Sequence, residues 1–501
     1  MTAVAELKEI LAEVADVGRA AGLLSWDQET YMPAGGVASR AHQVSTLRRL
    51  SHGRFTSAET ARLLERAEAE TQSLDYDSDD RSLVRVTQRD FGYAVKLPPD
   101  LVAEQASAVT TARPVWITAR AESDWKIFEP AMQRTVELAR RVADAYGYED
   151  SPYDALVGRG EPGLTSADVS RLFDDLKAVI PPLVQRARQA GGLDDKLLYG
   201  DFDEARQLAF AERTISRLGF DLDSGRQDLS AHPFCTSFGP GDVRLTTRVS
   251  RQHFPQCLFG SIHEAGHGMY NQGLPDRLDR TPLWGGATSG VHESQSRLWE
   301  NLVGRSRPFT RWLFPLVQAE FGGAFRQASA EDFYRAVNVV QPSYIRVEAD
   351  EITYNLHILM RCEIERDLIE GRLAVRDVPE AWNAKLSEYL GLSAPPDADG
   401  ALQDIHWTSP SLAGFVGYTV GNVIGAQLME AIRIALPELD AELEVGEFAP
   451  LLGWLRDNVH THGRKFTPNE LLERVTGSPL SAGPWVAYVR RKYGDLYGLA
   501  D

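Results

Sequence analysis

The chain has 501 residues, of which 43% are hydrophobic and 25% are charged, so it is long and apolar enough to form a large buried core. Aspartate and glutamate (71) outnumber lysine and arginine (53), and the net charge of −18 argues against nucleic acid or an anionic membrane as the main partner. The three cysteines, Cys235, Cys257 and Cys362, form no CxxC pair, which argues against a disulfide framework and favours a reducing cytoplasm.

Helices dominate the predicted secondary structure. Residues 1–26 carry acidic residues early and have the pattern of an amphipathic helix, not of an export signal. Further along, apolar residues recur at helical spacing, as at Val136, Leu138 and Val142, whereas alternation with period two is scarce. We therefore expect a mainly α protein.

The segments 74–82 and 391–400 are acidic or proline-rich, and we interpret them as connecting loops within one body. The expected organisation is a single domain over residues 1–501, with a helical N-terminal part at about 1–230 and a part at about 231–501 that carries the candidate metal site.

One segment departs from the helical pattern. Residues 242–250, "DVRLTTRVS", are rich in β-branched residues and follow the turn "FGPGD", which predicts a strand in a small sheet. The long uncharged stretch 405–429 is interrupted by polar residues and glycines, so it makes a poor membrane span. We expect it to be a loop followed by a buried helix.

The segment "SIHEAGHGMYNQG" contains an HExxH pattern. On a helix, His263 and His267 lie one turn apart on the same face, so both imidazoles can bind one ion, with Glu264 beside them. A zinc ion with such ligands lowers the pKa of its bound water to roughly 7, and an adjacent carboxylate can accept the proton. Because a chain of this composition contains HExxH by chance in about 2% of cases, the surrounding residues must support the interpretation.

The surroundings of the pattern offer a third ligand. Glu293 lies in the segment "TSGVHESQSRLWENLVG", which predicts a second helix with Ser289 as its N-cap. Arg297 and Glu300 would then share the side of Glu293, with Glu300 as an alternative ligand or a partner of one. His292 is expected to form local hydrogen bonds.

The glycines of the first helix are a further hint. Gly266 and Gly268 each cost a helix about 1 kcal/mol relative to alanine, so they suggest that another backbone approaches closely there.

Several segments, in this order, resemble the Taq-type thermostable metallocarboxypeptidases, zinc enzymes that remove single residues from peptide C-termini. They are "LLSWDQETYMPAGG" (23–36), "HPF" (232–234), "DVRLT" (242–246), "HEAGH" (263–267), "HESQ" (292–295), "IRVEA" (345–349), "GALQDIHW" (400–407) and "YGDLYGL" (493–499). The resemblance implies His263, His267 and Glu293 as metal ligands and Glu264 as the catalytic glutamate. It also implies a large helical zinc-peptidase fold with a deep central groove, and commonly a homodimer.

A carboxypeptidase must bind the terminal carboxylate of its substrate, for which the planar fork of arginine is well suited. Arg346 is the first candidate, because positions 346, 350, 354 and 357 would place Arg, Asp, Tyr and His on one helical face. An ion pair between Arg346 and Asp350 on a solvated face is the structural alternative. Arg244 is the competing carboxylate binder, although a pairing with Asp242 would explain it equally well.

The tetrahedral intermediate of peptide hydrolysis needs a hydrogen-bond donor at its oxyanion. His232, His406 and Tyr418 are the candidates: we assign His232 and Tyr418 to catalysis and His406 to substrate binding. Residues 412–416 depart from the family pattern, which has a Phe-Gly-Tyr-Phe-Pro run there; a tyrosine hydroxyl is absent at Gly414. Any substrate contact that the family makes at that position is therefore in doubt.

We therefore expect a metal-dependent carboxypeptidase that acts on peptides, with zinc as the default ion and cobalt or manganese as acceptable substitutes. Two alternatives remain. One is another HExxH enzyme, an oligopeptidase or dipeptidyl carboxypeptidase, and the other is an inactive peptide-binding scaffold that retains a metal.

Overall fold

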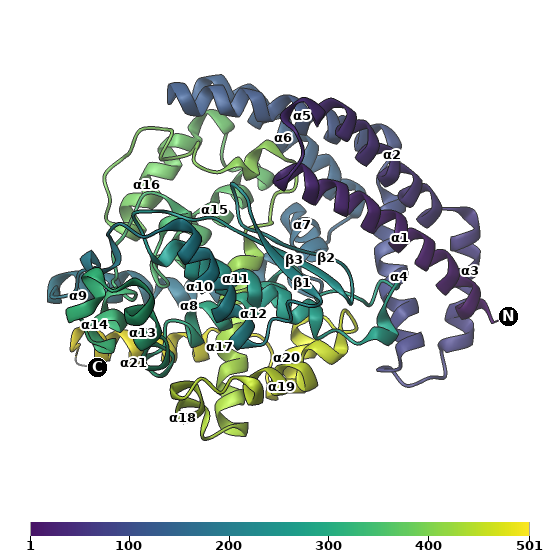
Figure 1. Cartoon of the computed structure of the whole chain (residues 1–501). Helices are drawn as coiled ribbons and strands as arrows, with labels where there is room; N and C mark the ends of the chain where they lie inside the picture. The colour runs from purple at the N-terminus through teal and green to yellow at the C-terminus, as the bar shows by residue number, and fades with distance from the viewer. Residues whose placement is uncertain (1, 500–501) are drawn as a thin grey trace.

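A computed structural model describes residues 2–499 of the chain, which form mainly helices around a small sheet (Figure 1). The expected mainly α fold with a small β-sheet is therefore confirmed. The N-terminal helices are α1 (Ala3–Thr30), α2 (Val37–Phe55), α3 (Ala58–Thr71), α4 (Asp79–Lys96), α5 (Pro99–Glu122) and α6 (Trp125–Tyr146). These bounds confirm the helices predicted near residues 1–26 and around Val136.

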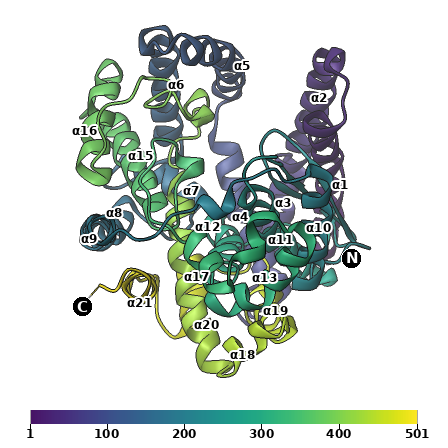
Figure 2. The same ribbon diagram turned by 60° about the vertical axis from the view of Figure 1, so that its left-hand side comes forward.

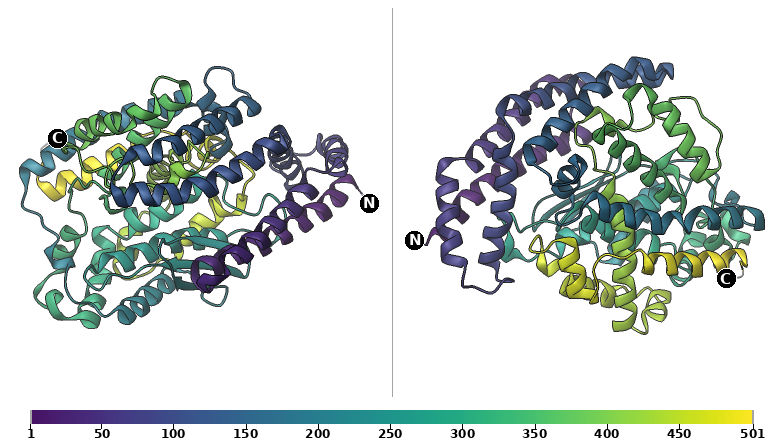
Figure 3. Two further views of the ribbon diagram at one scale, coloured as in Figure 1. Left: turned by 90° about the horizontal axis from the view of Figure 1, so that it is seen from above. Right: turned by 180° about the vertical axis from the view of Figure 1, so that it is seen from behind.

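Helices α1, α3 and α4 form a second hydrophobic core together with Leu278 and Leu283, and this core is separate from the main core of the molecule. Side-chain caps fix where two of them begin, since Ser57 accepts from the Thr60 amide and Ser78 from the Arg81 amide. Seen from above, α1 runs along the outside of the molecule (Figure 3). In Figure 2 the α1–α2 pair and the α5–α6 pair stand as two separate projections.

The acidic segment 74–82 is a loop only in its first part. Helix α4 begins at Asp79, so the last residues of the predicted loop form its first turn. Asp79 and Asp80 lie where the helix dipole favours negative charge, which explains why an acidic run begins a helix here. The predicted loop at 391–400 contains no helix or strand.

The sheet lies in the middle of the chain. It is preceded by α7 (Pro152–Gly160), α8 (Ser166–Lys177), α9 (Ile180–Ala190) and α10 (Glu204–Leu218). Its strands are β1 (Gly225–Leu229), β2 (Cys235–Gly239) and β3 (Asp242–Thr247), in the spatial order β1-β3-β2. Strand β3 pairs parallel with β1 and antiparallel with β2. The predicted strand at 242–250 is confirmed, although it ends at Thr247.

The C-terminal half surrounds the predicted metal site with helices. They are α11 (Pro255–Gln272), α12 (Ser289–Arg297), α13 (Arg307–Phe321), α14 (Ala330–Ala336), α15 (Thr353–Glu370), α16 (Val378–Leu390), α17 (Val416–Ala435), α18 (Leu439–Glu444), α19 (Ala449–Asn458), α20 (Pro468–Thr476) and α21 (Gly483–Tyr497). Helix α11 packs against β3 and α12, and α17 packs along α12.

Helix α17 is buried along most of its length, so the prediction of a loop and buried helix at 405–429 is confirmed. Within residues 2–499, no helix is both long enough and apolar enough to cross a membrane. The main hydrophobic core draws residues from Leu101 to Leu496, so most of the chain contributes to it. The division near residue 230 stays a prediction.

Candidate active site

Helices α11 and α12 pack with their backbones almost in contact. A Cβ atom at Gly266 would lie 2.6 Å from Ser296 Cα and 2.7 Å from Gln295 O, so only glycine allows this approach. From the other side, a Cβ atom at Gly421 of α17 would lie 2.6 Å from Glu293 Cβ. The close backbone approach expected from Gly266 is therefore present, and it fixes the position of Glu293 opposite α11.

The start of α12 differs by one residue from the prediction. Its N-cap is Thr288, whose side chain accepts from the Val291 amide, and not Ser289. Ser289 instead donates to the buried Glu161 at 2.6 Å, and Glu161 also accepts from the Gly290 amide. The first turn is thus anchored by a carboxylate from a distant segment, which spacing along α12 does not reveal.

The structure brings His263, His267 and Glu293 together as a candidate metal centre, with their ligand atoms all within 4.8 Å of one another. Glu293 Oε2 lies 3.8 Å from His263 Nε2 and 3.4 Å from His267 Nε2. Ligand atoms at 2.0–2.2 Å from a tetrahedral ion stand about 3.3–3.6 Å apart. Two imidazoles and one carboxylate at these separations therefore fit a divalent metal ion, and leave its fourth position open.

The outer nitrogens of both imidazoles are occupied by protein partners. His263 Nδ1 donates to Glu300 Oε2 at 2.9 Å. His292 Nε2 donates to Asn271 Oδ1 at 3.2 Å, so His292 Nδ1 accepts from His267 Nδ1 at 2.5 Å. Both Nε2 lone pairs are then free to bind a metal. Glu300 is thus the hydrogen-bond partner of the candidate ligand His263, and His292 is the partner that orients the candidate ligand His267.

Two arginines balance the carboxylates around this centre. Arg297 donates to Glu293 Oε1 at 2.7 Å and to Glu300 Oε2 at 3.1 Å, and Arg305 reaches Glu300 Oε1 at 3.4 Å. Burial raises the pKa of Glu300, but Arg297, His263 and Arg305 outweigh it and lower that pKa to about 2. Glu293 is likewise held below its ordinary pKa, against burial, mainly by Arg297. Both carboxylates are therefore ionised at neutral pH.

Glu264 lies beside the centre in a different environment. Its side chain is 6% exposed and has no hydrogen bond or ion pair within residues 2–499. Burial raises its pKa, and the nearby His263, His267 and His232 oppose that shift. A buried carboxyl group without a partner is available to accept a proton, which is what a general base requires.

Arg346 does not lie on the helical face that its spacing suggested. Residues Arg346–Glu348 form a short 3₁₀ turn, and α15 begins only at Thr353. Asp350 ends the turn by accepting from the Ile352 and Thr353 amides, both at 3.0 Å. The predicted stripe and the alternative Arg346–Asp350 ion pair are both wrong, because Asp350 caps the helix that Arg346 precedes.

Arg346 instead belongs to a buried charged group that we call the arginine cluster: Arg346, Arg361 and Asp404. Arg346 Nε and Nη2 donate to Asp404 Oδ1 at 3.1 and 3.0 Å, and Arg361 Nε donates to Asp404 Oδ2 at 2.5 Å. Arg346 is 5% exposed and Arg361 is fully buried. Two guanidiniums share one carboxylate, so the cluster keeps an excess of positive charge.

Tyr354 joins the arginine cluster to the candidate metal centre. Its hydroxyl accepts from Arg346 Nη1 at 3.2 Å, and the guanidinium of Arg297 lies 4.3 Å from the centre of its ring. Tyr418 lies nearby, with its ring centroid 5.5 Å from the Arg346 guanidinium and 6.3 Å from the ring of Tyr354. Arg346 and Tyr418 therefore approach the candidate metal centre from the side of α17.

His406 joins the same group through Phe415, since the two ring centroids lie 4.6 Å apart. Its Nδ1 is 3.6 Å from Asp404 Oδ1. Phe415 also lies 6.2 Å from the ring of Tyr418. Phe415 keeps the phenylalanine of the family pattern, whereas its neighbours Gly414 and Val416 depart from it, so the departure lies next to a ring that contacts the candidate residues His406 and Tyr418.

Arg244 lies apart from this group. Its fork is taken up by Asp242, with Arg244 Nε and Nη2 at 2.7 and 2.8 Å from the two carboxylate oxygens. Its guanidinium lies 4.3 Å from the ring of Trp26, which belongs to the N-terminal segment 23–36. The structure therefore shows the alternative considered for Arg244, an ion pair with Asp242. His232 is exposed in the turn between β1 and β2, on the Glu264 side of the centre.

Two charged residues of this region were not singled out from the sequence. Asp404 was noted only as part of "GALQDIHW", and Arg361 only as a letter in a long helix. Arg361 did leave a signal, because an arginine inside the apolar run "HILMRCEI" must be buried and therefore needs an acidic partner. No local pattern identifies that partner.

Comparison with known proteins identifies the family of the chain. The family model described as Carboxypeptidase Taq (M32) metallopeptidase matches residues 6–493. "Thermostable carboxypeptidase 1" of Thermus thermophilus is 40% identical over 98% of each chain. A crystal structure titled M32 carboxypeptidase from Deinococcus radiodurans is 43% identical, covers 98% of this chain and 99% of its own, and superposes with a TM-score of 0.95. The chain therefore belongs to the Taq carboxypeptidase (M32) family of metallopeptidases.

Proposed function

We propose that this protein releases single amino acids from peptide C-termini, with His263, His267 and Glu293 holding the metal ion and Glu264 acting as general base. The observation that carries the proposal is the buried, unpartnered Glu264 next to two imidazoles whose Nε2 atoms face a carboxylate. A divalent ion bound there supplies Lewis-acid chemistry by polarising the scissile carbonyl.

Glu264 is the residue that moves the proton. Its carboxylate accepts a proton from the attacking water and passes it to the nitrogen of the departing amino acid. Burial supports this role, since the raised pKa of Glu264 brings it closer to that of the groups with which it exchanges the proton. Glu300 and His292 hold the two imidazoles in orientation while this happens.

The arginine cluster is the proposed binding site for the substrate's terminal carboxylate. Its excess positive charge favours an anion, and Arg346 is its member closest to Tyr418. Arg244 is less suitable, because Asp242 already occupies its fork. Tyr418 and His232 are proposed as donors to the oxyanion, and His406 as a substrate contact. The Tyr418 hydroxyl has no hydrogen bond within residues 2–499, so it is free to donate.

Zinc is the proposed metal, because two imidazoles and one carboxylate with an open position are typical of catalytic zinc sites. Cobalt and manganese also accept nitrogen and oxygen ligands. Metal analysis of the purified protein, followed by activity after removal and replacement with each ion, tests this assignment.

The decisive experiment is mass spectrometry of an N-terminally blocked peptide incubated with metal-loaded wild type and with Glu264→Gln. We expect wild type to produce a ladder of peptides, each shorter by one C-terminal residue, and the variant to be slower by about 10²–10⁴-fold. Metal content is measured for both proteins. If both proteins contain the same amount of metal but differ in turnover, the loss of activity results from removal of the general base and not from loss of the metal ion.

Other outcomes would favour the alternatives. Internal cuts or released dipeptides would indicate an oligopeptidase or dipeptidyl carboxypeptidase, and bound metal without any cleavage would indicate a peptide-binding scaffold. The arginine cluster supports the exopeptidase, since an enzyme that cuts internally does not need to neutralise a terminal carboxylate.

We also propose that the protein is a cytoplasmic homodimer. The homodimer rests on the family resemblance, and light scattering after size-exclusion chromatography tests it. The compartment rests on Cys235, Cys257 and Cys362, which are free thiols, as a reducing environment favours.

A further inference from the structure

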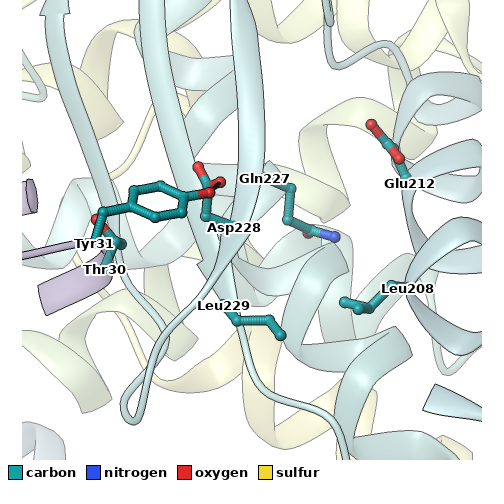
Figure 4. Close-up of a pocket in the computed structure, with 7 residues that line it drawn as sticks. All are labelled: Thr30, Tyr31, Leu208, Glu212, Gln227, Asp228 and Leu229. Carbon is teal, nitrogen blue, oxygen red and sulfur yellow. Dashed lines mark hydrogen bonds between the residues drawn. The ribbon is translucent and has the colours of Figure 1, made fainter. Parts of the chain in front are cut away.

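Two cavities lie outside the candidate metal centre, and their charges differ. The first, of about 340 Å³, lies beside β1 and the end of α1 (Figure 4). Its acidic Asp228 already binds Arg226 at 2.6 Å and the Tyr31 hydroxyl, as Figure 4 shows for Tyr31. The second, of about 300 Å³, lies between α4, α7 and the loop before α12. The second cavity carries the inference.

The lining of the second cavity is strongly basic. Three arginines, Arg89, Arg159 and Arg464, face a single acidic residue, Asp90. The chain as a whole has a net charge of −18, whereas this cavity has two excess positive charges, so its charge is opposite in sign to that of the molecule. Like charges this close repel one another, so such a grouping is stable only where something offsets the repulsion.

The protein offsets only part of this charge. Arg464 binds Asp90 at 2.9 Å and the Pro282 carbonyl at 3.0 Å. Arg89 reaches Asp90 only through Nε, at 3.5 Å. Arg159 has no ion pair or hydrogen bond within residues 2–499, and its guanidinium lies 5.4 Å from the ring centroid of Tyr93. Two guanidiniums therefore keep most of their donors unused.

The cavity removes two of the three guanidiniums in part from water, whereas Arg159 is exposed. The side chains of Arg89 and Arg464 are 25% and 26% exposed. Burial lowers the pKa of Arg89, and Arg464 lowers it further while Asp90 opposes both. Arginine stays charged even when it is partly buried. An oxyanion that accepts hydrogen bonds from its N–H groups would offset the free-energy cost of burying that charge.

We propose that this cavity binds a small oxyanion, held mainly by Arg89 and Arg159, with Tyr93 and Thr288 as neutral walls. The shared chemistry is a group with two acceptor oxygens, either a free phosphate or the carboxylate of an acidic side chain. The site is separate from the candidate metal centre and from the arginine cluster, and it goes beyond the proposed peptidase activity.

One wall of the cavity is the loop that leads into α12, and this loop connects the cavity to the candidate metal centre. A Cβ atom at Gly286 would lie 2.5 Å from Cδ2 of His292, the residue that orients His267. The Ala287 amide donates to the Tyr270 hydroxyl at 3.2 Å, and α12 with Glu293 begins two residues later. A bound anion therefore restrains the segment from which a proposed metal ligand projects.

Calorimetric titration of the metal-loaded full chain with inorganic phosphate at low ionic strength tests the proposal. Arg159→Gln is the main variant, because Arg159 is exposed and makes no ion pair or hydrogen bond within residues 2–499, so we expect its replacement to leave folding intact. We expect Kd to rise about tenfold or more in Arg159→Gln, and further when Arg89→Gln is added. Arg491→Gln, on the exposed face of the distant α21, is the matched control and should leave Kd unchanged.

A second titration, with the carboxylate compound N-acetylglutamate amide, distinguishes the two sources of the oxyanion. Tighter phosphate binding identifies a free dianion, and tighter carboxylate binding identifies an acidic side chain; both support the site if Arg159→Gln weakens them. Equal binding by wild type and the double variant would place the anion on the metal ion and overturn the proposal. Absence of binding by both probes would overturn it as well.

Discussion

Around the candidate metal centre, Glu293 and Glu300 bind the guanidiniums of Arg297 and Arg305, and Glu264 adds a third carboxyl group that has no ion pair within residues 2–499. In the arginine cluster, two guanidiniums share the single carboxylate of Asp404. The first region carries excess negative charge and suits a cation. The second carries excess positive charge and suits a carboxylate. Each region thus carries one uncompensated charge, and the proposed ligand of each region has the opposite sign.

The two regions also share a way of holding their functional groups. Each imidazole of the metal centre uses Nδ1 for a protein partner and keeps Nε2 free, and Arg346 uses Nε and Nη2 for Asp404 while Nη1 contacts Tyr354. In both cases, partners on the far side fix the orientation of the group that is proposed to face the substrate. Substitutions of these partners should therefore distinguish the effect of orientation from the effect of charge on ligand binding.

The largest effect is expected from Asp404→Asn, which removes the only negative charge of the arginine cluster. It leaves Arg346 and Arg361 buried beside each other without compensation, which should destabilise the protein by about 3–5 kcal/mol. Urea unfolding measures the change. Asp399→Asn, at an exposed site in the same loop, is the control and should be neutral. A loss below about 1 kcal/mol would show that the cluster does not depend on charge balance.

A neighbour makes the balance of the arginine cluster dependent on pH. Glu365 accepts from Trp407 Nε1 at 3.0 Å and from the Ala413 amide at 2.9 Å, and burial raises its pKa to about 7. The folded protein therefore holds the protonated form more tightly than the unfolded chain does. Protonation of Glu365 therefore contributes to the free energy of unfolding, and this contribution is fully present below pH 4.5 and is lost as the pH rises towards 7.

Glu365→Gln removes this titration while keeping the shape of the side chain. Between pH 4.5 and 7, wild type should lose up to about 3 kcal/mol of unfolding free energy relative to the variant. Urea unfolding of both proteins across this range measures the difference. Parallel curves would mean that Glu365 is ionised throughout and that the cluster carries no excess positive charge.

Arg346→Lys tests the carboxylate side of the comparison. Lysine keeps the positive charge but cannot present two parallel donors, so KM for a peptide with a free C-terminus should rise by about 10–150-fold. The measurement compares Arg346→Lys with Arg244→Lys, which should change KM by no more than about twofold, because Asp242 already occupies that fork. A larger rise in KM for Arg244→Lys than for Arg346→Lys would mean that Arg244 binds the substrate's terminal carboxylate.

The contrast between the two regions also explains what could be predicted from the sequence. His263 and His267 lie on one turn of one helix, and Gly266 marks the approach of α12, so the metal centre has a local signature. The arginine cluster has none, because Asp404 meets Arg346 and Arg361 only through the fold.

The helical spacing around Arg346 failed for a similar reason. A pattern with period 3.6 assumes a continuous helix, whereas Asp350 starts a new one by capping the Ile352 and Thr353 amides. The long helices α1, α6 and α17 were predictable because their apolar pattern is uninterrupted by such a cap. Sequence patterns thus located the cation side of the site and only one member of the anion side.

Glu300→Gln gives the smallest expected effect, on the metal side of the comparison. Glutamine can still accept from His263 Nδ1, so the imidazole keeps its orientation, but the negative charge that favours a cation is lost. Partners of this kind typically contribute 10–100-fold to metal affinity, and retention of the hydrogen bond places the expected loss at about tenfold.

Competition with a chelator of known affinity measures that loss in Glu300→Gln. Glu438→Gln, at an exposed carboxylate directly before α18, is the control for a general change in charge and should leave the affinity unaltered. Unchanged affinity in Glu300→Gln would mean that the metal centre depends on the orientation of His263 alone. A tenfold loss with normal stability would show that excess negative charge attracts the cation, just as we propose that excess positive charge attracts the substrate carboxylate at Arg346.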